Sequence, residues 1–291
     1  MIWGVMALGV YITFRLLDFA DLTVDGSIAT GAAVSVMLIR AGVSPIATLP
    51  IAFLAGALAG MVTGLLNTAL GIPGILASIL TQISLYSINL NIMGKANQPV
   101  SVDNYPLVVS LRYVTDGSVS RLLFFLGMIV FLLALIAVMY WYFGTEQGHA
   151  IRATGCNSNM ARAQGINTNF IKVLALMISN GLVGLCGALY GQFQGASDVN
   201  MGRGAIVIGL AAVIIGEVLF GKFASKRKLA FAFTLASVIL GAVIYYMVYQ
   251  FVLWLKMPSE DMKLFSAIVV AIFLAIPYLK EKRTLRKGAS K

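Results

Sequence analysis

The sequence predicts an all-α, polytopic membrane protein whose residues 1–291 form a single membrane domain. Hydrophobic residue types make up 59% of the chain and charged types only 11%, whereas about a quarter of the residues in a soluble domain are charged. The apolar residues run in continuous stretches close to the ~20 residues that a helix needs to cross a bilayer. A closed β-barrel, the other fold that satisfies its backbone in lipid, would show short alternating segments. The composition therefore excludes a soluble enzyme, a disordered chain and a disulfide scaffold.

The apolar stretches predict about nine transmembrane helices. They cover about 1–17, 26–40, 45–67, 72–92, 121–143, 170–191, 204–221, 229–255 and 264–279. The second is short, and the eighth is long enough to tilt in the membrane. In the third, Gly56, Gly60 and Gly64 recur every four residues, a spacing that lets helix backbones approach closely. We expect this helix to pack tightly against a neighbour.

Lysine and arginine residues predict the orientation of the helices. With the C-terminus placed inside the cell, fourteen of the 21 Lys and Arg residues fall on the inner side and seven on the outer side. Positive residues accumulate on the cytoplasmic side, so we expect the N-terminus outside and the C-terminus inside. Residues 280–291 carry +5 of the net charge of +10 and are expected to be a basic cytoplasmic tail on anionic lipid.

Two similar stretches, residues 20–31 and 197–209, each separate two apolar segments. Both contain a small residue, Asp, and an aliphatic, a polar and an aliphatic residue, then Gly with another Gly five positions later. The first lies at the inner side and the second at the outer side, so the copies run in opposite directions. Inverted repeats with broken segments are typical of transporters. We expect segments 1–4 and 6–9 to be inverted halves joined by segment five, although Asp and Gly also favour helix ends without a repeat.

The aspartates near the first break, Asp18, Asp21 and Asp25, have a simpler interpretation as well. Ionisable groups within a membrane are costly and usually face a cavity or a partner. The same residues can cap the second segment, with Asp25 beside the positive end of its dipole. We favour capping over direct contact with a solute. Glu217, near Lys222, is either a helix-packing residue or reaches the inner interface.

No feature of the sequence supports catalysis or a bound cofactor. The chain has one histidine, His149, no P-loop, and no two metal ligands one helical turn apart. Its two cysteines, Cys156 and Cys186, give no disulfide framework. We expect no metal and no ATP on this chain, and a transport subunit rather than an enzyme.

The longest inner loop, residues 144–169, is rich in Ala, Gly and Asn. Two short helices fit it, at about 147–154 and 158–164, with Asn157 as the N-cap of the second. Short helices of small residues can enter a groove on a partner protein. The alternative is a solvated loop that only carries positive-inside charge.

This loop contains the pattern Gly148-x-Ala150-x-Arg152-Ala153-x-Gly155-x-Asn157, followed by Ala161 and Gly165-Ile166. The pattern resembles the inner loop of permease subunits of ABC importers, in the family for branched-chain amino acids, ribose and nucleosides. Further stretches resemble the family in the same order along the chain: Met6–Tyr11, Asp21–Ser27 and Ser179–Leu189. The two Asp turns are most similar to those of members for amino acids, including aromatic ones such as tryptophan or tyrosine.

The resemblance implies that several chains work together in the plasma membrane of a prokaryote. Two permease subunits, which we expect to be a homodimer, form the path for a small polar solute, expected to be an amino acid. Cytoplasmic ABC ATPase subunits hold ATP and Mg²⁺ and dock on the loop 144–169. An extracellular substrate-binding protein delivers the solute to the outer loop, about 93–120. No nucleic acid is expected as a partner.

The resemblance also implies roles for particular residues. The ATPase-coupling surface is expected to consist of Gly148, Ala150, Arg152, Ala153, Thr154, Gly155, Asn157, Ala161 and Gly165. The translocation path is expected beside the two breaks, with Asp21, Asp25, Asn180, Gln192, Gln194 and Asp198 as candidate lining residues. On this reading Gly155→Trp abolishes transport without disturbing folding.

Three alternatives remain open from the sequence. An ion-coupled secondary transporter with inverted repeats would share the two breaks but would not need the small-residue loop. An intramembrane hydrolase would need a nucleophile and a base that face each other inside the membrane, and a structural scaffold would not need mirrored polar breaks.

Overall fold

The computed structural model describes residues 1–100, 105, 107–109, 120–224, 229–254, 268, 271 and 275, with the backbone alone at 120–122, 221–224 and 252–253. This part of the chain is mostly helical, as the composition predicts. Its elements are α1 (Ile2–Tyr11), the π-helix η1 (Ile12–Leu16), α2 (Val24–Arg40), α3 (Pro45–Thr68), α4 (Gly74–Met93), β1 (Asn97–Pro99), α6 (Ser120–Phe143), α7 (Glu146–Cys156), α8 (Ser158–Ala163), α9 (Thr168–Gln194), β2 (Ala196–Asp198), α10 (Ala205–Ala224) and α11 (Ala230–Trp254).

Eight of the nine predicted segments coincide with helices when α1 and η1 are counted together, and their ends agree within three residues. Five described helices, α3, α4, α6, α9 and α11, are long and apolar enough to cross a membrane, while α1–η1 and α10 are shorter apolar helices. Apart from residues 268, 271 and 275, the ninth segment, 264–279, lies outside the described residues, as does the whole tail, 280–291.

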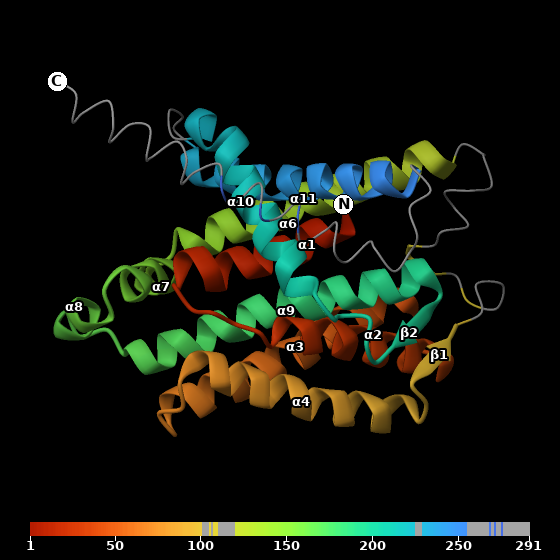
Figure 1. The fold of residues 1–291 in the computed structure, drawn as a ribbon, viewed down its shortest axis with the longest axis horizontal. Helices are drawn as coiled ribbons and strands as arrows, with labels where there is room; N and C mark the ends of the chain where they lie inside the picture. Colours follow the sequence, from red (N-terminus) through yellow and green to blue (C-terminus); the bar gives the residue numbers. More distant parts are fainter. Residues whose placement is uncertain are drawn as a thin grey trace.

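The helices form a bundle with two different ends (Figure 1). Helices α7 and α8 project at one end, here named the α7–α8 end, and the two strands lie at the other, the β1–β2 end. Helix α9 runs through the middle of the bundle and contacts α1, α2 and α3. Helices α10 and α11 pack against each other and against α1. The central position of α9 explains why it is the most buried of the five long apolar helices.

Small residues allow the close packing around α9. A β-carbon on Gly56 of α3 would overlap the carbonyl oxygen of Asn180, and Gly60 is equally close to α9. Helix α2 approaches α9 in the same way, because Gly31 lies against the carbonyl of Gly184. Small residues four apart permit this approach of two backbones. The predicted packing role of the glycines in the third segment is confirmed.

One departure from an all-α fold in the described part of the chain is a two-stranded antiparallel sheet. Strand β1 pairs with β2 so that Asn97 lies opposite Asp198 and Pro99 opposite Ala196. Arg40, at the end of α2, donates a hydrogen bond to the side-chain Oε1 of Gln98 in β1. Strands of three residues are too short to show an alternating pattern in a sequence, so the sheet was not expected.

Two segments without helix or strand enter the bundle from opposite ends: residues 17–23, here named the first break, and residues 199–204, the second break. After η1, Asp18 adopts a positive φ of 54°, and the chain runs without helix or strand from the α7–α8 end to the middle of the bundle, where α2 begins (Figure 1). After β2, a turn leads from the β1–β2 end back to the middle, where α10 begins. Both α2 and α10 therefore start inside the bundle.

Candidate functional site

The carboxylate of Asp25, in the first turn of α2, lies at the N-terminus of α10. Its Oδ2 accepts a 2.9 Å hydrogen bond from the backbone N–H of Gly204, and its Oδ1 accepts one of 2.9 Å from Ile206. The first N–H groups of a helix lack partners within the helix, and its dipole favours a negative charge there. Asp25 thus caps α10, whereas the sequence-based interpretation placed its capping role on the second segment, which is α2. The two breaks meet at this residue.

Glycine and aspartate shape the turn that reaches Asp25. A β-carbon on Gly202 would overlap the carbonyl oxygen of Asp25, and Gly204 has a φ of +85°, which residues with a β-carbon rarely adopt. The Oδ1 of Asp198 accepts a 2.7 Å hydrogen bond from the N–H of Asn200, which tightens the turn. The turn after β2 therefore delivers its N–H groups to the carboxylate of Asp25.

Asp21 lies in the first break and is bonded to the central helix α9. Its Oδ2 accepts a 2.7 Å hydrogen bond from the side-chain amide of Asn180, and its Oδ1 accepts one of 2.9 Å from the N–H of Thr23. The amide oxygen of Asn180 in turn accepts a 2.7 Å hydrogen bond from Ser27. Asp21 is 3% exposed and Asn180 is fully buried. The hydrogen bond between Asp21 and Asn180 joins the first break to α9 and thereby fixes the course of the break.

The two glutamines among the expected path residues lie in other surroundings. The side-chain amide nitrogen of Gln192 lies 3.2 Å from three oxygens at the α2–α3 junction, and its oxygen accepts a hydrogen bond from the N–H of Val108. Gln192 is buried, and its amide is fully used in these contacts. Gln194 is exposed and donates to the hydroxyl of Tyr190. Of the expected path residues, Asp25 alone lines a cavity between α2, α4 and the turn after β2.

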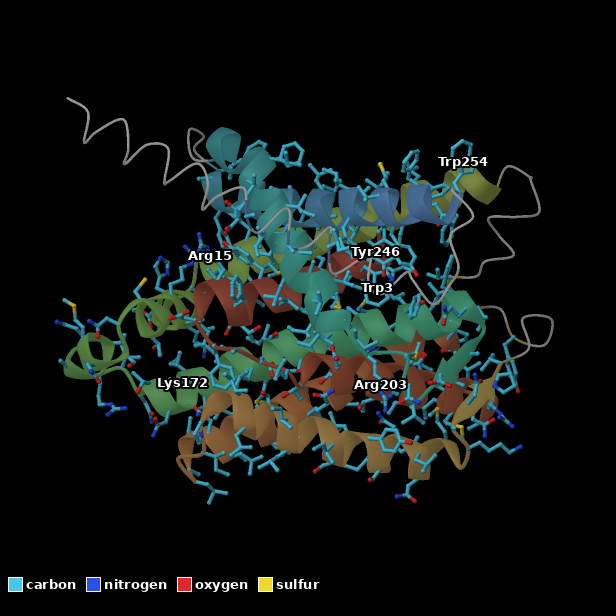
Figure 2. All side chains as sticks on the ribbon, viewed as in Figure 1. Trp3, Arg15, Lys172, Arg203, Tyr246 and Trp254 are labelled. Carbon is cyan, nitrogen blue, oxygen red and sulfur yellow. The ribbon has the colours of Figure 1, made fainter. Side chains whose placement is uncertain are left out.

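This cavity has a volume of about 290 Å³ and lies between the start of α2, one face of α4 and the turn after β2. Its wall consists of Asp25, Gly26, Gln82, Ile83, Tyr86, Ser87, Asn89, Val199, Asn200 and Arg203. Figure 2 labels Arg203 between the ribbons of α9 and α4. The predicted site residues did not include those of α4. The sequence did indicate a polar face on this helix, because Gln82 and Asn89 lie seven residues apart and therefore on the same side of a helix.

Helices α7 and α8 confirm the two short helices expected in the loop 144–169. The Oδ1 of Asn157 accepts hydrogen bonds of 3.1 Å and 3.0 Å from the N–H groups of Asn159 and Met160, so the predicted N-cap is confirmed. Arg152 lies over the ring of Phe231, 4.0 Å from its centre, and near that of Phe143. These contacts hold α7 against α6 and α11.

The nine residues expected on the coupling surface lie in three different environments. Gly148, Thr154 and Ala161 are buried, Ala150, Arg152, Ala153 and Gly155 are half-buried, and Asn157 and Gly165 are exposed. Gly148 packs against Phe143, Gly155 against Leu16, and Arg152 against Phe231, so these three residues hold α7 in place. An exposed residue that the pattern did not single out is Met160 of α8, with 63% of its surface exposed.

An open groove of about 730 Å³ lies beside α7 at this end of the bundle. Its wall consists of Gly144, Glu146, Gln147, His149, Ala150, Ala153, Ile166 and Ile171. The wall thus combines polar side chains at the start of α7 with small and aliphatic residues of α7 and α9. A partner helix or loop of moderate size could enter it.

Helix α7 also contacts the segment that leads into the first break. A β-carbon on Gly155 would overlap the carbonyl oxygen of Leu16, the last residue of η1. The expectation that Gly155→Trp leaves folding undisturbed does not agree with this geometry.

Arg15, the residue before Leu16 in η1, forms an ion pair with α10. Its Nε lies 2.8 Å from the Oε1 of Glu217, and Figure 2 places Arg15 near the α7–α8 end. Glu217 therefore pairs with a basic residue and links η1 to α10.

Residues 1–277 match the protein family described as "Branched-chain amino acid transport system / permease component". A tyrosine transport system permease protein from Clostridioides difficile (strain R20291) is 40% identical over 275 residues, which are 94% of this chain and 88% of the relative. An uncharacterized protein from Rickettsia prowazekii (strain Madrid E) is 31% identical over 274 residues, 93% of this chain and 92% of the relative.

A more distant similarity is to the autoinducer 2 import system permease protein LsrC of Yersinia pseudotuberculosis (strain YPIII). It is 28% identical over 238 residues, which are 80% of this chain and 62% of the relative. No solved structure matches the chain. Among the residues that the structure describes, no group of three His, Cys, Asp or Glu side chains could hold a metal ion.

Proposed function

Because the chain belongs to the permease components of branched-chain amino acid transport systems, which are multi-pass ABC transporter permeases of the prokaryotic plasma membrane, we propose that it is the membrane-spanning subunit of an ABC importer. It forms the path for a small polar solute, an amino acid and in particular an aromatic one. The 40% identity to a relative named for tyrosine transport supports this choice of solute. ATP and Mg²⁺ are held by separate ATPase subunits, and this chain is not an enzyme.

The observation that carries this proposal is the pair of helices α7 and α8 in a chain of this family. They project from one end of an otherwise apolar bundle, and an open groove lies beside them. The exposed Met160 and the groove wall give an ATPase subunit a surface to dock on. The contact between Gly155 and Leu16 transmits a displacement of α7 to the first break. ATP binding can shift the permease between two states only if the ATPase binds them differently.

The path is proposed to run beside the two breaks, where Asp25 meets the turn after Asp198. Nine membrane spans, an inverted repeat, an external N-terminus and a cytoplasmic C-terminus belong to the same proposal. Broken helices that begin inside the bundle from opposite ends support the inverted arrangement (Figure 1). A second copy of the chain completes the path as a homodimer.

An extracellular substrate-binding protein is proposed to dock at the β1–β2 end. The outer loop expected for this contact, about 93–120, lies partly outside the described residues. The sheet formed by β1 and β2 fixes the start of that loop to the end of α9, which supports a defined surface at this end.

The test is co-purification of the chain with the products of neighbouring genes, followed by an ATPase assay in lipid with and without the neighbouring binding protein. We expect an ATPase to stay bound and to hydrolyse ATP faster with the binding protein and L-tyrosine present. Met160→Asp should weaken the association at least tenfold without changing the melting temperature, because it places a charge on an exposed apolar contact. Met160→Leu, the matched control, should retain it. A chain that purifies alone overturns the proposal.

The second candidate is the ion-coupled secondary transporter, and one observation favours it. The carboxylate of Asp21 is almost fully buried inside the bundle, and such carboxylates serve as ion or proton sites in transporters. An uptake assay in vesicles that contain this chain alone separates the two candidates, since a secondary transporter takes up its solute there when an ion gradient is present, whereas the importer needs its ATPase.

A further inference from the structure

The cavity beside Asp25 contains a buried amide group without a protein partner. Asn89 is 1% exposed, and neither its Nδ2 nor its Oδ1 makes a hydrogen bond to any residue that the structure describes. Asn89 lies in the wall of the cavity. Buried amides in proteins are nearly always hydrogen-bonded, because an unpaired buried polar group is destabilising. An unpaired amide in the wall of a polar cavity therefore indicates a ligand that supplies the missing hydrogen bonds.

The other residues of the wall define what that ligand is. Arg203 carries a positive charge and has no ion pair or side-chain hydrogen bond among the described residues. The carboxylate of Asp25 accepts one N–H at each oxygen and retains further acceptor positions, because a carboxylate has about four. Tyr86 and Ile83 give the wall an aromatic and an aliphatic surface. The cavity thus combines one cation, one anion, one unpaired amide and an apolar face.

We propose that this cavity, named here the Asn89 pocket, binds the transported solute inside the permease chain as a single zwitterionic amino acid. The α-carboxylate lies at Arg203, the α-ammonium group at Asp25, and the amide of Asn89 bonds to the polar groups of the ligand. The volume of about 290 Å³ is near the lower limit of ligand cavities, which suits one amino acid and excludes a peptide. The identity of the solute rests on the proposed function, whereas the pocket itself rests on its geometry.

The position of the pocket gives it a role in movement of the solute. Its wall includes the N-terminus of α2 and the turn that leads into α10, which are the two places where the chain breaks. A ligand at Arg203 and Asp25 would contact both breaks at once. Because a ligand shifts an equilibrium only through its different affinity for two states, the pocket couples occupancy to the relative position of α2 and α10.

The experiment measures equilibrium binding of radiolabelled amino acids to the full chain in lipid nanodiscs, with L-tyrosine as the first probe and the other nineteen in turn. Asn89→Leu should weaken L-tyrosine binding about tenfold, since it removes hydrogen bonds to the ligand, and should leave the melting temperature equal or higher. Asn91→Leu is the matched control, because Asn91 lies on the same helix, is exposed and bonds to Ser87 of its own helix. It should bind as the wild type does.

Arg203→Gln provides a second variant at an exposed turn, where the fold tolerates the change. It should weaken L-tyrosine binding but leave unchanged any weak binding of tyramine, which lacks the carboxylate. Wild-type affinity in Asn89→Leu, or absence of binding for all twenty amino acids, overturns the pocket. A chain that binds an ATPase and imports L-tyrosine with the same KM in Asn89→Leu and wild type also overturns the pocket but retains the proposed function. Binding of L-tyrosine by a chain with which no ATPase co-purifies retains the pocket and overturns the importer.

Discussion

Gly155 of α7 lies so close to Leu16 that a β-carbon on residue 155 would overlap the carbonyl oxygen of residue 16. The contact joins the helix at the α7–α8 end to the last residue before the first break. Leu16 ends a π-helix, and π-helical turns inside helices are frequent at functional sites. A displacement of α7 must therefore either move the first break or separate α7 from η1.

The first prediction is that Gly155→Ala destabilises the protein and reduces transport. The methyl group forces α7 away from η1, and overpacking of this kind costs about 1–3 kcal/mol. Thermal unfolding of the purified chain and uptake of the solute in vesicles measure the two effects. Gly127→Ala is the control, because Gly127 lies in helix α6 with open space around it, and it should unfold at the wild-type temperature or slightly above. Equal stability of Gly155→Ala and wild type would contradict the close contact.

The second prediction concerns the buried pair of Asp21 and Asn180. Asn180→Leu removes the amide partners of the Oδ2 of Asp21 and of the hydroxyl of Ser27, and buried polar groups left without a hydrogen bond are destabilising. We expect a loss of about 3 kcal/mol in the free energy of unfolding. Denaturant or thermal unfolding in detergent measures it. Asn91→Leu, which changes an exposed asparagine, should shift stability by no more than about 0.5 kcal/mol; a similar small shift for Asn180→Leu would contradict the network.

The third prediction concerns the capping of α10 by Asp25. Asp25→Ala removes both hydrogen bonds and the charge at the helix dipole, which together should cost about 1–2 kcal/mol. Hydrogen exchange of the backbone N–H groups of Gly204 and Ile206 should become faster than in the wild type. Asp25→Asn keeps an acceptor oxygen but not the charge, so its exchange rates should fall between the two. Unchanged exchange at both residues in Asp25→Ala would show that the cap is absent in the membrane.

The fourth prediction uses the two native cysteines to test the orientation of the chain. Cys156, at the end of α7, is exposed, and Cys186, in α9, is buried. In the proposed orientation, a membrane-impermeant maleimide labels Cys156 in inside-out vesicles but not in intact cells. Cys156→Ala should remove the signal, and denaturation should expose Cys186 as a second labelled site. Labelling of intact cells at Cys156 would reverse the orientation.

The positions of the helices could be predicted from the sequence because they depend on the length of each apolar stretch. The cap at Asn157 could be predicted equally well, since its two partners lie two and three residues further along the chain. The short sheet could not be predicted, because the pairing of Asn97 with Asp198 joins segments about a hundred residues apart and each strand has three residues.

The site was harder to predict because its contacts are distant in the sequence. Asp25 caps a helix that starts some 180 residues later, and no local pattern indicates such a partner. Asn89 was visible as a polar residue in an apolar helix, but only the structure shows that its amide is buried without a partner beside Arg203. Gly148 and Gly155 could pack against either a partner or the chain itself, and a small residue in a sequence does not distinguish the two.

The cap of α10 has a consequence for how the protein is made. The N–H groups of Gly204 and Ile206 lie at the start of α10 inside the bundle and are accepted by the carboxylate of Asp25, and a backbone group left unpaired within a bilayer costs several kcal/mol. Asp25 leaves the ribosome long before those residues do. Helix α2 must therefore already be inserted and correctly placed when α10 enters the membrane, so that synthesis from the N-terminus supplies each half of the bundle in the order in which it is needed.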